Sequence, residues 1–198
     1  EREILANPED SLIVSTLGDM VRSQAILYQN GKYRMWYVDN KRNIGHRNVC
    51  YSESDDGHTW KKREICALTG KEINPWHLDL TKIEGKFYLT IYDLWNLTLW
   101  ESKDGISFEY KKEVIKPSLV YGSFYSDGLY RSSLIKDNFG YKLYFSAFDE
   151  RKTSIGLLRG CSLMDMRISS ILADTPSFLF LLKAYFVNRK RLISSIKQ

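Results

Sequence analysis

The chain has 198 residues, of which 43% are hydrophobic and 14% are aromatic. This length allows one substantial core, so the chain is one domain or part of one. Its formal net charge of +5 arises within the last sixteen residues, which hold five basic side chains and no acid. The rest of the chain is near neutral, which argues against a nucleic-acid groove.

The three cysteines, Cys50, Cys66 and Cys161, are odd in number and lack the spacing of metal ligands. They argue against a small scaffold held together by disulfides. We therefore expect no metal site and no cofactor.

Short strands separated by turn residues are predicted along most of the chain. Runs rich in aromatic and β-branched residues, bounded by Gly, Asn, Asp or Pro, are typical of strands and hairpins. In chain order, the predicted strands are residues 12–17, 22–28, 34–38, 48–51, 76–80, 87–92, 97–101, 108–114, 130–135, 141–148 and 153–158.

Two motifs recur in the same order. Residues 54–60 (SDDGHTW) match residues 102–108 (SKDGISF) at a spacing of 48 residues. A hairpin motif at Gly31 recurs at Gly85 and again at Gly140, with spacings of 54 and 55 residues. In the first motif, Ser and Asp can bond nearby backbone amides and Gly supplies a positive φ. We interpret those turns as folding devices.

A unit of roughly 50 residues with about four short strands is typical of a β-propeller blade. We predict an all-β propeller with blades at residues 12–70, 71–116 and 117–165, followed by a helical basic tail at 166–198. Propellers close with at least about four blades. Either residues 12–17 belong to a further blade, or the chain is a piece of a larger propeller.

The tail predicts a short C-terminal helix, with Thr175 as N-cap and Pro176 in the first turn. The apolar run at residues 178–182 precedes basic residues 189–191. We interpret this helix as packed on the sheet with a solvated cationic end. One alternative is a membrane-surface anchor, since the run is too short to span a bilayer. Another is a segment foreign to the fold.

The inner strands of successive blades point toward one axis, so polar residues at their entries surround a single funnel. The residues at these entries are Asp19, Arg22, Ser23, Trp76, His77, Asp79, Asp127, Tyr130 and Arg131.

Several of these residues also have a purely structural interpretation. Asp19 and Asp127 each adjoin a glycine and are typical turn residues. Trp76 fits a core position and His77 a hydrogen-bonded structural one. The arginines Arg22 and Arg131 either converge on a carboxylate or phosphate, or form ion pairs that hold adjacent blades together.

Residues 76–80 (WHLDL), followed by residues 83–89 (IEGKFYL), resemble a pattern of glycoside hydrolase family 43. In that family the pattern is Trp-Ala-Pro-Asp-Val leading to Gly-Lys-Tyr-Tyr-Leu. The resemblance covers residues 12–160 and extends to the related invertase, levansucrase and mannoside-phosphorylase families. It implies a five-bladed β-propeller of glycosidase type. The Ser-x-Asp-Gly turns also resemble sialidase Asp boxes, which lie on the rim away from the active site.

The resemblance implies three carboxylates from separate blades: a base, a tuning Asp and an acid. One carboxyl protonates the leaving oxygen while another activates water. Asp79 matches the tuning Asp, but the base position falls at Ser23 and the acid position at Arg131 or Ser132. Two of the three carboxylates are thus absent from the matched places.

Asp19 and Asp127 could supply acids from neighbouring positions, so the candidate catalytic residues are Asp79, Asp19 and Asp127. The candidate substrate-binding residues are Arg22, Arg131, His77, Trp76 and Tyr130.

Two functions fit this sequence. The first is a glycoside hydrolase-like propeller that acts on a glycan in the axial funnel, with the two arginines gripping an anionic sugar or phosphate. The second is a non-catalytic glycan-binding or interaction propeller that has lost its acids. The missing carboxylates favour the second, and the retained Asp79 favours the first. We expect a glycan as partner, no nucleic acid, and a secreted or periplasmic location rather than a cytoplasmic one.

Overall fold

The computed structural model describes residues 20–40, 45–93, 95–120, 123–149 and 152–168. These residues form strands, turns and loops only, so the predicted all-β class is confirmed for them. In this part of the chain, no helix has the length and apolar character needed to cross a membrane. The predicted strand at 12–17, the candidate Asp19 and the C-terminal helix with its proposed membrane contact lie outside the described residues.

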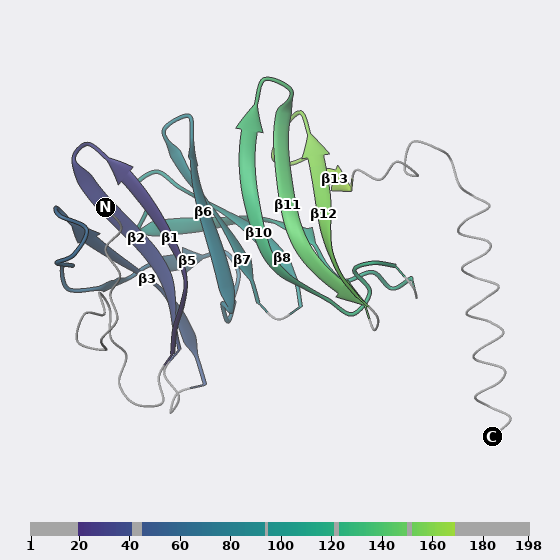
Figure 1. Cartoon of the computed structure of the whole chain (residues 1–198), viewed down its shortest axis with the longest axis horizontal. Coiled ribbons are helices and arrows are strands. Elements are labelled where there is room, and N and C mark those ends of the chain that lie inside the picture. The colour runs from purple at the N-terminus through teal and green to yellow at the C-terminus, as the bar shows by residue number, and fades with distance from the viewer. Residues whose placement is uncertain (1–19, 41–44, 94, 121–122, 150–151, 169–198) are drawn as a thin grey trace, which may run out of the picture.

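The described strands form three sheets (Figure 1). The first has the order β1 (Met20–Gln29), β2 (Lys32–Asn40), β3 (Arg47–Ser54) and β4 (Glu64–Ile65). The second has the order β5 (Ala67–Thr69), β9 (Ser107–Ile115), β8 (Leu97–Ser102), β7 (Lys86–Tyr92) and β6 (His77–Ile83). The third has the order β10 (Gly128–Asp137), β11 (Gly140–Asp149), β12 (Lys152–Gly160) and β13 (Arg167–Ile168).

Neighbouring strands are antiparallel except for β5 and β9, which pair in parallel. β5 follows the first sheet along the chain but belongs to the second, where the N–H of Ala67 donates to the carbonyl of Ile106 at 3.0 Å. The chain thus crosses between sheets through one hydrogen-bonded segment. The division into blades at residues 70, 116 and 165 stays a prediction.

Two of the three predicted hairpin glycines have the same role. The β1–β2 turn has positive φ at both Asn30 and Gly31, and the β6–β7 turn has positive φ at both Glu84 and Gly85. Two successive positive φ values define the tight turn that suits the twist of a hairpin. Gly140 differs, because it pairs with Asp137 and lies one position later than the other two glycines.

The innermost strands β1, β6 and β10 lie side by side, and the other strands of each sheet extend away from them (Figure 1). One apolar cluster fills the space between the first and second sheets, with Trp36, Leu80 and Leu89 buried in it. Another cluster, with Leu97 and Phe145, fills the space between the second and third sheets. Because both faces of the second sheet are covered, β7 and β8 are buried at nearly every position.

The two Ser-Asp-Gly turns, residues 54–60 and 102–108, have the same internal hydrogen bonds. In the second, the Ser102 hydroxyl donates to Asp104 and accepts the N–H of Gly105 at 2.8 Å. The Asp104 carboxylate also accepts two further backbone N–H groups. The first turn repeats all four bonds. Their equivalence shows that the motif is a local structure.

The two turns differ in which tryptophan closes them. Trp60, at the end of the first turn, donates its indole N–H to the carbonyl of Gly57 at 3.2 Å. The carbonyl of Gly105 in the second turn instead accepts the indole N–H of Trp36, from the first sheet, at 2.6 Å. The second turn is therefore part of the contact between two sheets, whereas the first closes on itself.

Candidate functional site

Two of the three inner strands are bulged. In β1 the pairing register slips between Arg22 and Ala25, and in β10 it slips between Leu129 and Ser132. β6, which contacts both strands, pairs with β7 without such a slip. A bulge bends its strand and re-aims the side chains around it, and bulges are common beside functional sites.

Ser23 lies in the first bulge with a φ of 56°, a left-handed conformation that is uncommon for residues other than glycine. It is only 3% exposed, and its hydroxyl is hydrogen-bonded to Nδ1 of His77. Strain of this kind persists where the surrounding structure enforces it, often at functional sites. The bulge thereby brings a hydroxyl of β1 against the first residue of β6.

His77 is 4% exposed, and its second ring nitrogen, Nε2, has no hydrogen-bond partner among the described residues. The ring of Tyr130 meets it edge-on with centroids 4.3 Å apart, and the ring of Tyr92 stacks at 6.4 Å. Burial, and then the charges of Arg131 and Arg22, lower the pKa of His77 to about 4. His77 is thus neutral at pH 7 and has one unused nitrogen in a positive environment.

Trp76, just before β6, is approached by two guanidinium groups. The Cζ atoms of Arg22 and Arg47 lie 4.2 and 4.1 Å from its ring, within cation–π range. Asn74 positions Arg47 by accepting its backbone N–H at 3.0 Å. Burial and the charge of Arg22 lower the pKa of Arg47. The Nε and Nη1 atoms of Arg47 are buried without a hydrogen-bond partner among the described residues.

These side chains are called the axial cluster below: Arg22, Ser23, Arg47, Trp76, His77, Tyr130 and Arg131. The structure brings together all five residues that the sequence predicted for substrate binding. The charges of Arg131 and Arg22, from β10 and β1, both lower the pKa of His77, and the Cζ atom of Arg131 lies 5.8 Å from the ring of Tyr130. The cluster gathers aromatic rings and polar side chains from four strands, β1, β3, β6 and β10.

Asp79 lies two residues after His77, on the face of β6 that turns toward β10. Its carboxylate accepts the backbone N–H groups of Leu134 and Leu80, and burial raises its pKa. Thr81, next on the same face, donates to the carbonyl of Leu134 at 2.8 Å. Asp79 therefore ties two inner strands together. It also lines a groove of about 720 Å³ between them.

The other predicted acids are not placed in the axial cluster. Asp127 is exposed just before β10, where its carboxylate accepts the Ser126 hydroxyl at 3.3 Å. Its backbone N–H donates to the carbonyl of Phe148 at 3.1 Å. These contacts fit the turn role that its neighbouring glycine indicated. Asp19 lies outside the described residues.

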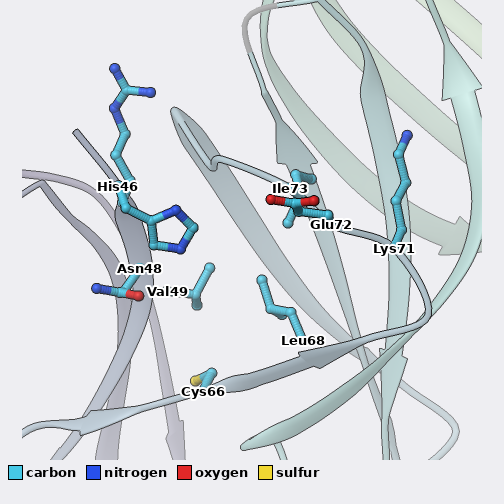
Figure 2. A pocket seen from close by; sticks show the side chains of 9 residues that line it. His46, Asn48, Val49, Cys66, Leu68, Lys71, Glu72 and Ile73 are labelled. Carbon is cyan, nitrogen blue, oxygen red and sulfur yellow. The ribbon is translucent and has the colours of Figure 1, made fainter. Parts of the chain in front are cut away.

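A cavity of about 220 Å³ lies beside the axial cluster and shares Arg47 with it. Figure 2 shows His46 on one side of this cavity and Lys71 and Glu72 on the other. Cys66 lies in its wall, and burial raises the pKa of this thiol to about 12, so it stays protonated. Within the described ranges, no three His, Cys, Asp or Glu side chains are grouped so that they could hold a metal ion.

Sequence reasoning missed Arg47 and Asn74. Arg47 begins the third strand of its sheet, not an inner strand, and no motif marks it. It reaches Trp76 only because the chain before β6 passes beside β3, where the Asn74 side chain also donates to the carbonyl of Gly45 at 3.3 Å.

Solved structures of carbohydrate-active proteins share this arrangement of sheets. A family 117 glycoside hydrolase from Zobellia galactanivorans matches 77% of this chain and 56% of its own length, with a TM-score of 0.64 and 16% identity. A thermostable family 43 glycoside hydrolase matches 77% of this chain and 53% of its own, with a TM-score of 0.57 and 16% identity. The chain has the fold of the five-bladed β-propeller glycoside hydrolases.

A third match is an N-acetylgalactosamine deacetylase from F. plautii, in complex with blood group B trisaccharide. It covers 63% of this chain and 40% of its own length, with a TM-score of 0.55 and 23% identity. The chain thus spans about half the length of the solved structures that it matches. No protein-family model matches the chain, and no curated protein is similar to it in sequence.

Proposed function

We propose that this propeller binds a glycan at the axial cluster. The observation that supports this proposal is the gathering of aromatic rings and unbonded buried nitrogen atoms from separate strands. Trp76 and Tyr130 present ring faces and edges, while His77 and Arg47 have buried nitrogens without a hydrogen-bond partner among the described residues. Buried polar atoms are nearly always bonded in a finished structure, so unused ones favour a ligand that supplies the acceptors.

The chemistry of a sugar matches these groups. Its C–H faces pack on aromatic rings, and its hydroxyl oxygens accept hydrogen bonds from nitrogen donors. The fold shared with glycoside hydrolases supports a sugar as the ligand, although a fold alone does not define a function.

A binding screen with wild type and Trp76→Ala tests this proposal. The wild type is expected to bind one class of glycan on an array, and Trp76→Ala is expected to weaken that binding about tenfold because the ring platform is lost. Phe139→Ala is the matched control, since Phe139 is an aromatic residue that is 88% exposed in the β10–β11 turn. Equal affinities for the wild type and Trp76→Ala would contradict a site at the axial cluster.

Glycosidic-bond hydrolysis is the second candidate function, and Asp79 is the observation that favours it. A carboxyl group whose pKa is raised by burial is suited to donate a proton to a leaving oxygen. The partner acid would come from Asp127 or Asp19, which the sequence named as catalytic candidates.

Release of reducing sugar from each bound glycan distinguishes the two functions. Hydrolysis predicts release by the wild type and its loss in Asp79→Asn, with binding retained. Binding without release would leave Asp79 as a link between β6 and β10.

A further inference from the structure

The axial cluster holds several positive charges close together. Arg22 and Arg47 approach the same ring of Trp76, and the charge of Arg22 lowers the pKa of Arg47, second only to burial. Arg131 adds a third guanidinium, 5.8 Å from the ring of Tyr130, which itself meets the ring of His77 at 4.3 Å. Positive charges held together in a partly buried place attract an anion.

The unused donor atoms lie among these charges. Nε2 of His77 is buried and unbonded among the described residues, because Ser23 occupies only the other ring nitrogen, Nδ1. Nε and Nη1 of Arg47 are also buried and have no hydrogen-bond partner among the described residues. A guanidinium group presents its N–H donors in a planar fork that matches the oxygens of a carboxylate or sulfate.

We infer that the axial cluster binds an oxyanion carried by the sugar, a carboxylate or a sulfate group, through Nε2 of His77 and the guanidinium groups of Arg47 and Arg131. This inference rests on the proposed function and narrows its ligand to acidic glycans. Trp76 packs against the sugar ring, and Ser23 acts as a positioning residue. In the proposed site its hydroxyl donates to Nδ1 of His77, which leaves the ring proton on Nε2, toward the anion.

The protonation of His77 responds to such a ligand. The groups that face it are Arg22 from β1, Tyr92 from β7, and Tyr130 and Arg131 from β10. In the free protein the two arginines disfavour a charged imidazole. A bound anion offsets their charge, so the pKa of His77 is expected to rise from about 4 toward its ordinary value.

The decisive experiment is calorimetric titration of the 198-residue chain with galacturonate, galactose 6-sulfate, galactose and inorganic sulfate, at low and at physiological salt. An acidic sugar is expected to bind about tenfold more tightly than galactose, with the advantage reduced by salt. Comparison of the two acidic sugars identifies which oxyanion the cluster prefers. Arg131→Gln is expected to remove the preference for acidic sugars. Arg159→Gln, a change of the same charge on β12, is expected to leave it intact.

The outcomes separate this inference from the proposed function. Equal binding of galactose and both acidic sugars overturns the oxyanion site but leaves glycan binding standing. Binding of inorganic sulfate alone supports the oxyanion site and contradicts the glycan ligand. No binding of any of the four overturns both.

Imidazole NMR provides a readout that a merely structural role for Ser23 would not change. In the wild type, the nitrogen shifts of His77 are expected to show the proton on Nε2, and its pKa is expected to rise on addition of the acidic sugar. Ser23→Gly is expected to lose the single tautomer and most of the affinity. A wild-type pKa that does not move with saturating acidic sugar would overturn the contact between His77 and the anion.

Discussion

The axial cluster and the Ser-Asp-Gly turns are opposite cases of polar side chains in one fold. In the turns, Asp104 accepts three hydrogen bonds and lies on the surface, and Asp56 repeats these bonds. In the axial cluster, His77 is buried, and its Nε2 has no hydrogen-bond partner in the part of the chain that the structure describes. The Ser and Asp side chains of the turns are bonded within the turns, whereas the cluster keeps buried nitrogens without a hydrogen-bond partner among the described residues. Changes in the turns should therefore affect stability, and changes in the cluster should affect binding.

The largest expected effect is the loss of the tryptophan that joins the second turn to the first sheet. Trp36→Ala removes a side chain with no exposed surface and the bond to Gly105, so we expect it to destabilise the fold by about 3–5 kcal/mol. Trp60→Ala removes only the local closure of the first turn and should cost about 1 kcal/mol. Urea denaturation measures both. Equal losses would show that the two turns contribute alike to the packing of the sheets.

The next effect compares the turn glycines. Gly57 and Gly105 have φ values of 81° and 83°, so alanine is strained at both. A Cβ atom on Gly105 would lie 3.0 Å from the ring of Trp36, whereas one on Gly57 would lie 3.4 Å from Tyr33. We expect Gly105→Ala to cost about 1–3 kcal/mol and Gly57→Ala about 1 kcal/mol. Both variants should keep wild-type glycan affinity. A loss of affinity in either would contradict the claim that the turns affect stability but not binding.

Ser23→Gly is a change in the axial cluster that should reduce binding and leave stability nearly unchanged. Glycine tolerates the φ of 56°, so relief of strain offsets the lost hydrogen bond and the net change in stability should stay within about 1 kcal/mol. Ser23→Ala loses the same hydroxyl without relieving the strain and should be less stable than Ser23→Gly. Both should weaken glycan binding about tenfold. If Ser23→Gly binds like the wild type, Ser23 is only a structural residue.

The last comparison separates the turns from the axial cluster by the pH at which each loses stability. The pKa of Asp104 falls from 3.8 to about 2 in the folded protein, chiefly because backbone N–H groups bond its carboxylate. Its stabilising contribution is therefore present above pH 3.8 and is lost as the pH falls toward 2. The effect should be small because the carboxylate is exposed. Asp104→Asn should flatten the stability profile over that window.

His77 acts over a higher window. Its pKa falls from 6.5 to about 4, so the unfolded chain takes up the proton first and stability is lost as the pH falls from 6.5 to 4. His77→Gln should flatten only this upper window. Chemical denaturation at a series of pH values measures how the free energy of unfolding changes with pH in each variant. If both variants flattened the same pH window, the assignment of the lower window to Asp104 and the upper one to His77 would be wrong.

The fold could be predicted from the sequence because its signals are local. Alternating turn residues and β-rich runs mark most of the strands, and the repeated motif marks two equivalent turns. Hydrogen bonds of a turn such as residues 102–108 close within a few residues, so the same letters produce the same structure twice. The repeat also predicted that Arg22 and Arg131, at equivalent positions, approach one place, and the charges of both act on His77.

The remaining features depend on contacts between distant segments, which local patterns do not encode. Arg47 belongs to the axial cluster because the segment before β6 passes beside β3, and Ser23 takes a strained conformation only because a bulge presses it against His77. Asp79 follows a family pattern in the sequence, yet its carboxylate is engaged by the backbone of β10. The sequence by itself determined the strands, the turns and the type of propeller. Only the packing of the sheets decided which polar atoms are bonded and which remain unused, because that depends on distances across the sheets.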